Sequence, residues 1–289
     1  MLWIEYFQCS CREFNTKQWA ISRQMRLSYF CFVKGKFYKY QGTGNDFVVL
    51  DGRDWSHDWN EKQVQLICSR KWGVGSDGLI VVKPHASLDF EMVFFNPDGS
   101  QSFCGNGSRV AVSFFNRFFK DQGNFNFMAI DGEHSAKMEG HEVEVKMKNV
   151  QGGFTWESGC FLNTGSPHVI VPHSELESLD ILLEGRRVRY HADFANHNGT
   201  NVNFVQFGER GLEVRTYERG VEDETLSCGT GVTAAGLYYL EQKKMSGSVS
   251  IQTRGGQLEV RADRKGSFEF ENVYLKGGAE FVFEGVWEV

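Results

Sequence analysis

Two short segments of the chain repeat one pattern, in which a cysteine opens a Cys-Gly-x-Gly turn that leads into small and apolar residues. The first is Cys104-Gly-Asn-Gly-Ser-Arg-Val-Ala-Val, and the second is Cys228-Gly-Thr-Gly-Val-Thr-Ala-Ala-Gly. Two more pairs of strand-like segments match upstream in the same order: residues 88–95 with 212–219, and residues 44–50 with 165–171. Because the matched segments keep their order, the sequence predicts two halves of similar fold.

The remaining pattern of each half indicates short strands and one helix that begins just after the cysteine. Helices are predicted over 60–70, 105–119, 174–179 and 229–243. Strands are predicted over 37–41, 47–51, 79–83, 90–95, 142–147, 168–171, 201–207, 212–217, 249–253, 257–261, 268–274 and 280–284. This pattern predicts an α+β protein with two pseudo-symmetric domains, each a curved, mostly antiparallel sheet around a central helix. The active site is expected in the cleft between them.

The polar, Gly-rich segment 149–160 is predicted to join the two halves. We therefore expect an N-terminal half over 35–150 and a C-terminal half over 151–277. Residues 1–34 lie outside the repeat. They are expected to be either a flexible extension or a segment that precedes a natural start at Met25.

The composition narrows the class of protein. With 41% hydrophobic and 24% charged residues, the 289-residue chain is able to bury a sizeable core. The net charge of −6 disfavours nucleic acid or an anionic membrane as a partner. No apolar stretch approaches the roughly 20 residues that span a bilayer, and the N-terminus has no apolar signal-peptide region. A cytoplasmic location is expected, whereas assembly as a homodimer is left open.

Seven cysteines are scattered along the chain without a CxxC pair, so they are predicted to be free thiols rather than metal ligands or disulfides. Nothing resembles a Schiff-base lysine site or a nucleotide-binding fingerprint. We therefore expect no metal and no cofactor.

The two turns explain how cysteines could do chemistry here. A helix that starts after the cysteine directs its free N–H groups and its positive dipole end at the turn. Such a field stabilises a thiolate, so the pKa of Cys104 and Cys228 is expected to lie below the free value of about 8.5. The same N–H groups form a site for a carboxylate. If the halves face each other, two thiols flank one bound carboxylate, an arrangement suited to racemisation or epimerisation of an amino acid.

Six motifs, in order from about Lys36 to the C-terminus, resemble those of the diaminopimelate epimerase family. They are Gly42-Thr-Gly-Asn-Asp-Phe, Phe95-Asn-Pro-Asp-Gly-Ser, Cys104-Gly-Asn-Gly-Ser-Arg, Gly165-Ser-Pro-His, Asn201-Val-Asn-Phe, and Tyr217-Glu-Arg-Gly followed by Cys228-Gly-Thr-Gly. The resemblance implies interconversion of LL- and meso-diaminopimelate without pyridoxal phosphate, in lysine and peptidoglycan-precursor synthesis.

The resemblance also implies a role for individual residues. Cys228 would take the proton from the LL-isomer and Cys104 would return one, while His168 and Glu218 adjust the proton affinity of the thiols. The residues implied to bind substrate are Asn45, Asn96, Gly105, Asn106, Ser166, Asn201, Glu218, Arg219, Gly229 and Thr230. The last strand, within 278–289, is implied to return to the first domain. Ser166 stands where the family often has Asn, which puts a direct substrate contact there in doubt.

Three other functions compete with this interpretation. Proline racemase or hydroxyproline epimerase shares the Cys-Gly-Thr-Gly turn, but its first cysteine usually lies in a Cys-Gly-His turn. A non-catalytic ligand-binding protein needs no matched pair of cysteines. A thiol redox sensor needs no asparagine-rich pocket.

Overall fold

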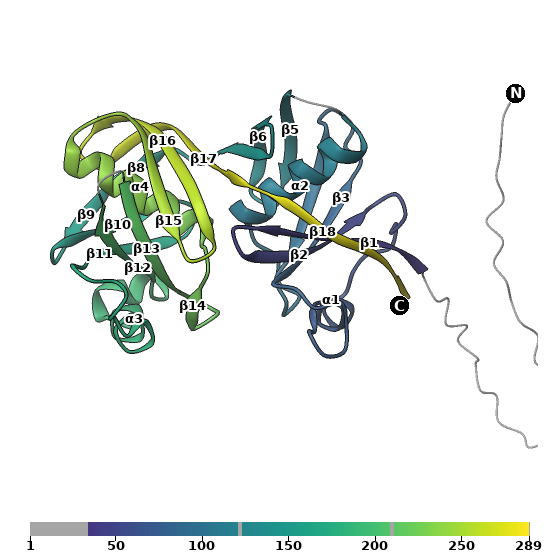
Figure 1. Ribbon diagram of the computed structural model, residues 1–289, viewed down its shortest axis with the longest axis horizontal. Helices are drawn as coiled ribbons and strands as arrows, with labels where there is room; N and C mark the ends of the chain where they lie inside the picture. The colour runs from purple at the N-terminus through teal and green to yellow at the C-terminus, as the bar shows by residue number, and fades with distance from the viewer. Residues whose placement is uncertain (1–33, 121–122, 209–210, 289) are drawn as a thin grey trace, which may run out of the picture. The chain divides into compact units, whose positions relative to one another are not determined.

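The computed structural model describes residues 34–120, 123–208 and 211–288 (Figure 1). The extension expected over 1–34 therefore lies outside the described residues, except for Lys34. The first half contains β1 (Lys34–Gly42), β2 (Asn45–Asp51), α1 (Glu61–Cys68), β3 (Gly78–Lys83), β4 (Phe90–Phe95), α2 (Gly105–Phe118), β5 (Gly123–Ala129), β6 (Gly132–Glu139), β7 (Glu142–Lys146) and β8 (Val150–Gln151).

The second half continues the chain from the short strand β9. Its elements are β9 (Gly153–Trp156), β10 (Gly159–Asn163), β11 (Pro167–Pro172), α3 (Ile181–Arg189), the 3₁₀ helix η1 (Ala192–His197), β12 (Asn201–Phe207), β13 (Gly211–Glu218), β14 (Asp223–Thr225), α4 (Gly229–Lys243), β15 (Gly247–Thr253), β16 (Gly256–Gly266), β17 (Glu269–Gly278) and β18 (Glu280–Glu288).

The strand pairings of the two halves repeat one another. In the first half β1 pairs antiparallel with β2, β2 parallel with β3, β3 antiparallel with β4 and β4 parallel with β5. In the second half β10, β11, β12, β13 and β15 pair in the same sequence of antiparallel and parallel contacts. The helix that follows the cysteine connects the last parallel pair each time. The predicted α+β fold with two pseudo-symmetric, mostly antiparallel sheets is confirmed.

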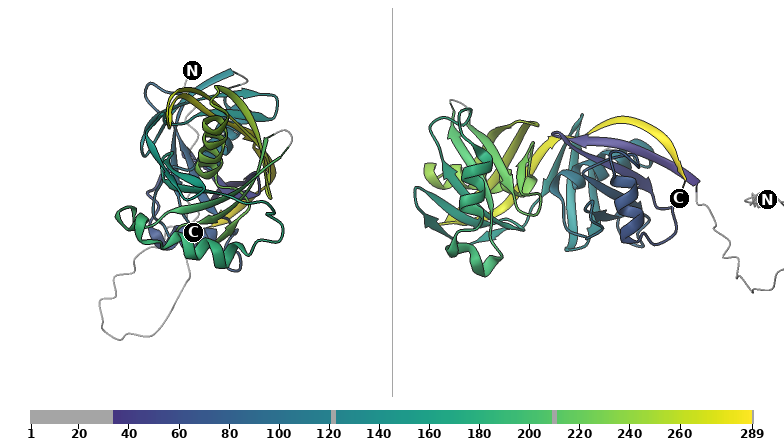
Figure 2. Two further views of the ribbon diagram at one scale, coloured as in Figure 1. Left: turned by 90° about the vertical axis from the view of Figure 1, so that its left-hand side faces the viewer. Right: turned by 90° about the horizontal axis from the view of Figure 1, so that it is seen from below.

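Three strand pairings connect the halves. β17 pairs antiparallel with β7 and with β8, and β18 pairs antiparallel with β1, with Lys34 opposite Glu288. Figure 2 shows β18 lying beside β1, so the C-terminal end of the described chain lies next to its first strand. We propose that the N-terminal half ends at residue 150 and that the C-terminal half ends at residue 277.

Each sheet buries one face against a central helix and the other against a shorter one. The first ten residues of α2, 105–114, are all buried, and α4 is buried over most of its length. Apolar side chains of both central helices belong to one large core. α1 covers the opposite face of the first sheet, and α3 covers the opposite face of the second. The central helices are thus held rigidly, which fixes the position of their N-termini.

Several predicted elements need correction. The helix predicted over 174–179 is wrong, since the helix is α3, capped by the Asp180 side chain, which accepts the Leu183 N–H at 3.0 Å. The missing side chain of Gly185 lets α3 approach Tyr217 closely. The predicted junction 149–160 is not loop alone, because β8 and β9 lie in it. The strands β5, β6, β10 and β14 were also missed. The other three predicted helices are confirmed.

Candidate active site

Both repeated cysteines are the N-cap residues of the central helices. Cys104 caps α2, and its Sγ accepts the Gly107 N–H at 3.3 Å. Cys228 caps α4 and lies 3.6 Å from the Thr230 hydroxyl. Both have extended backbone angles, as expected of an N-cap residue. The sequence pattern of Cys-Gly-x-Gly therefore marks a helix start in each half.

The two helix N-termini lie close together at the glycines that follow the cysteines. A methyl group on Gly105 would lie 3.8 Å from the Gly229 Cα, and one on Gly229 would lie 3.2 Å from Asn106 Oδ1. Asn106 also spans the two halves, since its Nδ2 donates to the Ser227 carbonyl at 3.0 Å. Two sets of free helix N–H groups thus converge, which creates a region suited to an anion.

Both thiols line one cavity of about 980 Å³. Of the other residues predicted for the site, seven line it as well: Asn45, Asn96, Ser166, Asn201, Glu218, Arg219 and Thr230. Gly105, Asn106, Gly229 and His168 lie behind this lining, in buried positions. The tertiary structure therefore brings the whole predicted set to one place, in two layers.

The predicted lowering of the thiol pKa values is wrong. Burial raises the pKa of the Cys104 thiol to about 11, although the Gly107 N–H opposes the shift, and the nearby Glu218 carboxylate raises it further. Burial and Glu218 likewise raise the pKa of Cys228. Burial also raises the pKa of Glu218 itself, against a hydrogen bond at 2.8 Å from the Thr225 hydroxyl. Desolvation of the charged form outweighs the helix N-terminus at both cysteines.

His168 lies behind Cys228 and is fully buried. Its Nε2 lies 2.9 Å from the Ser166 hydroxyl and 2.9 Å from the Thr230 hydroxyl. Burial, with a smaller contribution from Arg219, lowers the pKa of His168 to about 3, so the ring is neutral at physiological pH. The Thr230 hydroxyl therefore lies between His168 and Cys228 and contacts both.

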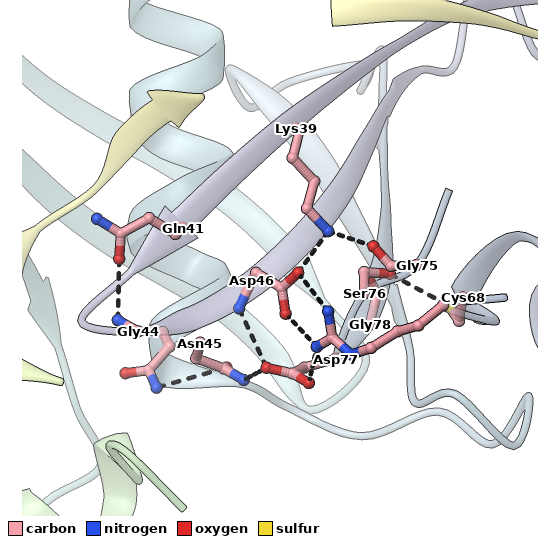
Figure 3. Close-up of polar contacts among 12 residues, drawn as sticks. Lys39, Gln41, Gly44, Asn45, Asp46, Cys68, Gly75, Ser76, Asp77 and Gly78 are labelled. Carbon is pink, nitrogen blue, oxygen red and sulfur yellow. Dashed lines mark hydrogen bonds and ion pairs between the residues drawn. The ribbon is translucent and has the colours of Figure 1, made fainter. Parts of the chain in front are cut away.

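A network of charged groups orients Asn45 at the start of β2 (Figure 3). Asn45 Nδ2 donates to Asp77 Oδ2 at 3.1 Å, and the Asp46 N–H donates to the same oxygen at 3.2 Å. The Arg70 guanidinium forms an ion pair at 2.7 Å with the Asp46 carboxylate and another at 2.7 Å with the Asp77 carboxylate. The Asn45 amide thus presents its oxygen toward Asn106, 3.5 Å from Nδ2.

Asn201 and Arg219, which line the cavity from the second half, are also held by hydrogen bonds to their neighbours. Asn201 Oδ1 accepts the Arg219 N–H at 2.9 Å, and Asn201 Nδ2 donates to the Pro167 carbonyl at 2.9 Å. Arg219 Nη1 donates to the His197 carbonyl at 2.8 Å. This guanidinium has no carboxylate partner among the described residues, which leaves its charge available to an anionic ligand.

Asn96 is held within its own turn. Its Nδ2 donates to the Ser100 hydroxyl at 3.0 Å and to the Ser102 hydroxyl at 3.2 Å. Asn96 thus serves as a turn residue while also lining the cavity.

Two residues of the site were missed in the sequence. Arg109, on α2, is fully buried with no carboxylate partner in the described chain, and its Nη2 donates to the Thr43 hydroxyl at 2.9 Å. Among the described residues, Cys104 is the ionisable neighbour that shifts the pKa of Arg109 toward the charged form. Asn203, on β12, contacts His168. Both stood in the quoted motifs, and the period of two along a strand places Asn203 on the face of Asn201.

Within the described residues, no group of three or more His, Cys, Asp or Glu side chains could hold a metal ion. Across 34–120, 123–208 and 211–288, no helix is both long and apolar enough to cross a membrane.

The duplicated fold occurs in solved structures of distant sequence. A phenazine biosynthesis protein of the PhzF family from Bacillus anthracis has a TM-score of 0.69 at 16% identity, covering 89% of this chain and 99% of that one. A hydroxyproline epimerase from Agrobacterium vitis has a TM-score of 0.61 at 13% identity, covering 89% and 93%. The chain thus has the fold of a class that includes an amino-acid epimerase.

The sequence comparison identifies the family within this class. The family model for diaminopimelate epimerase matches residues 37–153 and 160–282. A diaminopimelate epimerase from Flavobacterium psychrophilum is 44% identical over 254 residues, covering 86% of this chain and 98% of that protein. Another from Aquifex aeolicus is 39% identical over 277 residues, covering 86% and 96%. The chain belongs to the diaminopimelate epimerase family and is an isomerase.

Proposed function

We propose that the protein interconverts LL- and meso-diaminopimelate without a cofactor, and that Cys104 and Cys228 exchange the α-proton. One observation carries the proposal: two related helices, each capped by a cysteine, meet at their N-termini beside one cavity that both thiols line. The family membership supports the substrate and a place in lysine and peptidoglycan-precursor synthesis. Free thiols at the four described cysteines support a reducing, cytoplasmic location.

The proposed reaction moves one proton in and one proton out. With LL-diaminopimelate, the Cys228 thiolate takes the α-proton and becomes a thiol, and the electron pair is delocalised into the carboxylate. The Cys104 thiol then gives its proton to the opposite face of the same carbon and becomes the thiolate. The product has the inverted configuration, and the enzyme is ready for the reverse reaction.

The electrostatics of the site suit this reaction. An α-proton is a very weak acid, so a thiolate of raised pKa is the stronger base, although it is present in a smaller fraction of molecules. The converging N–H groups of α2 and α4 would stabilise the charge that develops on the carboxylate. Glu218 raises the proton affinity of both thiols. Asn45, Asn96, Asn201 and Arg219 would bind the remaining polar groups, with Arg219 at the distal carboxylate.

Deuterated water tests the two-thiol reaction. At low conversion of LL-diaminopimelate, the meso product should carry one deuterium at the inverted carbon, while the remaining LL substrate carries little. This follows because the delivered proton comes from a thiol that has exchanged with solvent, whereas the removed proton lies on the other thiol. Equal labelling of substrate and product would indicate a single base.

Single cysteine variants provide the second test. Cys104→Ala and Cys228→Ala should each abolish epimerisation with little change in stability. Cys68→Ala is the matched control, since Cys68 is a free, buried cysteine that does not line the cavity. More than trace epimerisation by either site variant would refute the proposal. Turnover of L-proline or hydroxyproline by the unmodified enzyme would instead favour the related racemases.

A further inference from the structure

A buried hydrogen-bond chain leads from β13 through β12 and β11 to the Cys228 sulfur. The Thr216 hydroxyl donates to Asn203 Oδ1 at 3.1 Å, and Asn203 Nδ2 lies 3.1 Å from His168 Nδ1. His168 Nε2 lies 2.9 Å from the Thr230 hydroxyl, which lies 3.6 Å from Cys228 Sγ. Thr216, Asn203 and His168 are each at most 3% exposed, so these groups satisfy one another.

The orientation of the Asn203 amide is fixed by a backbone carbonyl. Asn203 Nδ2 also donates to the Val169 carbonyl at 3.2 Å. A carbonyl only accepts, so the amide nitrogen must face it, and the amide oxygen must face Thr216. The second Nδ2 hydrogen then points at His168 Nδ1. Because His168 is neutral and its Nδ1 accepts, its single proton lies on Nε2.

The proton on Nε2 determines the direction of the remaining bonds. The single Nε2 hydrogen of His168 is shared between Ser166 Oγ and Thr230 Oγ1, so neither hydroxyl donates to the ring. Ser166 Oγ also lies 3.4 Å from Asn201 Nδ2, which donates to it, and its own hydrogen is directed at Thr230 Oγ1, 3.3 Å away. With both acceptor positions of Ser166 occupied, the Thr230 hydrogen is left for the Cys228 sulfur.

We infer that Asn203 is a positioning residue for Cys228: it holds His168 in the Nε2–H tautomer, so that the Thr230 hydroxyl donates to the Cys228 sulfur and stabilises its thiolate. This inference rests on the proposed function. It assigns Ser166 to the same network, where its hydroxyl accepts from His168 and donates to Thr230, in place of a direct substrate contact. It also means that His168 does not accept the Cys228 proton.

The described residues of the first half do not repeat this arrangement. In the turn that begins at Cys104, Asn106 occupies the position that Thr230 has in the turn that begins at Cys228. Asn106 forms hydrogen bonds with Ser227 and Asn45 instead. The hydrogen bond to Cys104 comes from the main chain at Gly107. The titratable groups that face Cys228 are Glu218 on β13 and Cys104 at α2, while Arg219 faces His168. The hydrogen-bond chain that ends at Cys228 therefore makes the surroundings of the two otherwise similar thiols different.

Nitrogen-15 NMR of the imidazole tests the tautomer directly in the unmodified protein, whether or not it turns over a substrate. We expect His168 to show a protonated Nε2 and an unprotonated Nδ1 between pH 6 and 8. Asn203→Asp should move the proton to Nδ1, because a carboxylate accepts where the amide donated. Thr216→Val is the matched control, since it removes a bond to Asn203 but leaves the Val169 contact, and should keep the Nε2–H form. A protonated Nδ1 in the unmodified protein would overturn the inference.

A double-mutant cycle tests the effect on Cys228. Asn203→Asp and Thr230→Val should each lower kcat/KM about 10- to 100-fold, the loss expected for one hydrogen bond to a charged group. The fall should be equal in both directions, because the equilibrium constant of the reaction is unchanged. The double variant should be no slower than Thr230→Val. Additive losses would overturn the inference, whereas an unmodified protein without epimerase activity would refute only the proposed function.

Discussion

Replacing Gly231 with Ala should destabilise the protein, although Ala is the better helix former. Gly231 lies in the first turn of α4, and a methyl group there would be 2.3 Å from Asn203 Oδ1 and 3.3 Å from His168 Cε1. Asn203 is fully buried, and its amide is held by bonds to Thr216, Val169 and His168. The substitution therefore forces the amide away from Thr216, Val169 and His168.

The change in the free energy of unfolding is the balance of one favourable and two unfavourable contributions. Ala gains about 1 kcal/mol over Gly within a helix. Overpacking of a buried site costs about 1–3 kcal/mol, and leaving a buried polar group without its partner costs about 1–3 kcal/mol more. The net loss is about 3 kcal/mol in the free energy of unfolding, which corresponds to a fall of about 6–12 °C in Tm for a chain of this size.

Thermal unfolding followed by circular dichroism measures this change. Gly278→Ala is the matched control, because a methyl group on Gly278 would meet nothing within 4 Å, and its Tm should stay within about 2 °C of the unmodified protein. An unchanged or higher Tm for Gly231→Ala would refute the reasoning, since it would mean that Asn203 is free to move.

Three further changes test the charges of the site. Arg219→Ala should reduce kcat/KM for diaminopimelate by orders of magnitude, because loss of a charge-assisted bond in a closed site costs about 2–5 kcal/mol; comparable rates for lysine and diaminopimelate would place the distal carboxylate elsewhere. Alkylation of Cys104 by iodoacetamide should keep rising with pH to about 11, because the thiolate is the reactive form and its pKa is raised; a plateau near pH 8.5 on peptide mapping would contradict this. Arg109→Met should leave Tm unchanged or raise it, because an unpaired buried charge is costly, yet it should slow that alkylation, because Arg109 favours the Cys104 thiolate. A fall in Tm of more than 5 °C would show that the guanidinium stabilises the fold.

The local sequence was sufficient to predict the helices that follow the two Cys-Gly-x-Gly turns. The helices α2 and α4 begin at the glycine after each cysteine, as predicted, because an N-cap and its following glycine act within a single turn. The duplication was readable for the same reason, since matched segments keep their order in the chain. The polar residues of the site were found through their motifs, and most of them line one cavity.

The predictions that depended on tertiary packing were wrong. The helix dipole suggested thiols of lowered pKa, but burial by both halves raises the pKa of Cys104 and Cys228. The short strands β9 and β10 were missed because their glycines weaken the strand pattern, whereas pairing with a neighbouring strand supplies the hydrogen bonds.

From the sequence alone we could identify the repeated plan, the two helix starts and the two cysteines, because these features depend on residues close together in the chain. Which buried groups meet depends on the tertiary structure. Asn203 contacts His168 from a neighbouring strand, and Asn106 reaches Ser227 in the other half. Desolvation and hydrogen-bond direction depend on such distant neighbours, so the proton affinity of the two thiols is a property of the assembled fold.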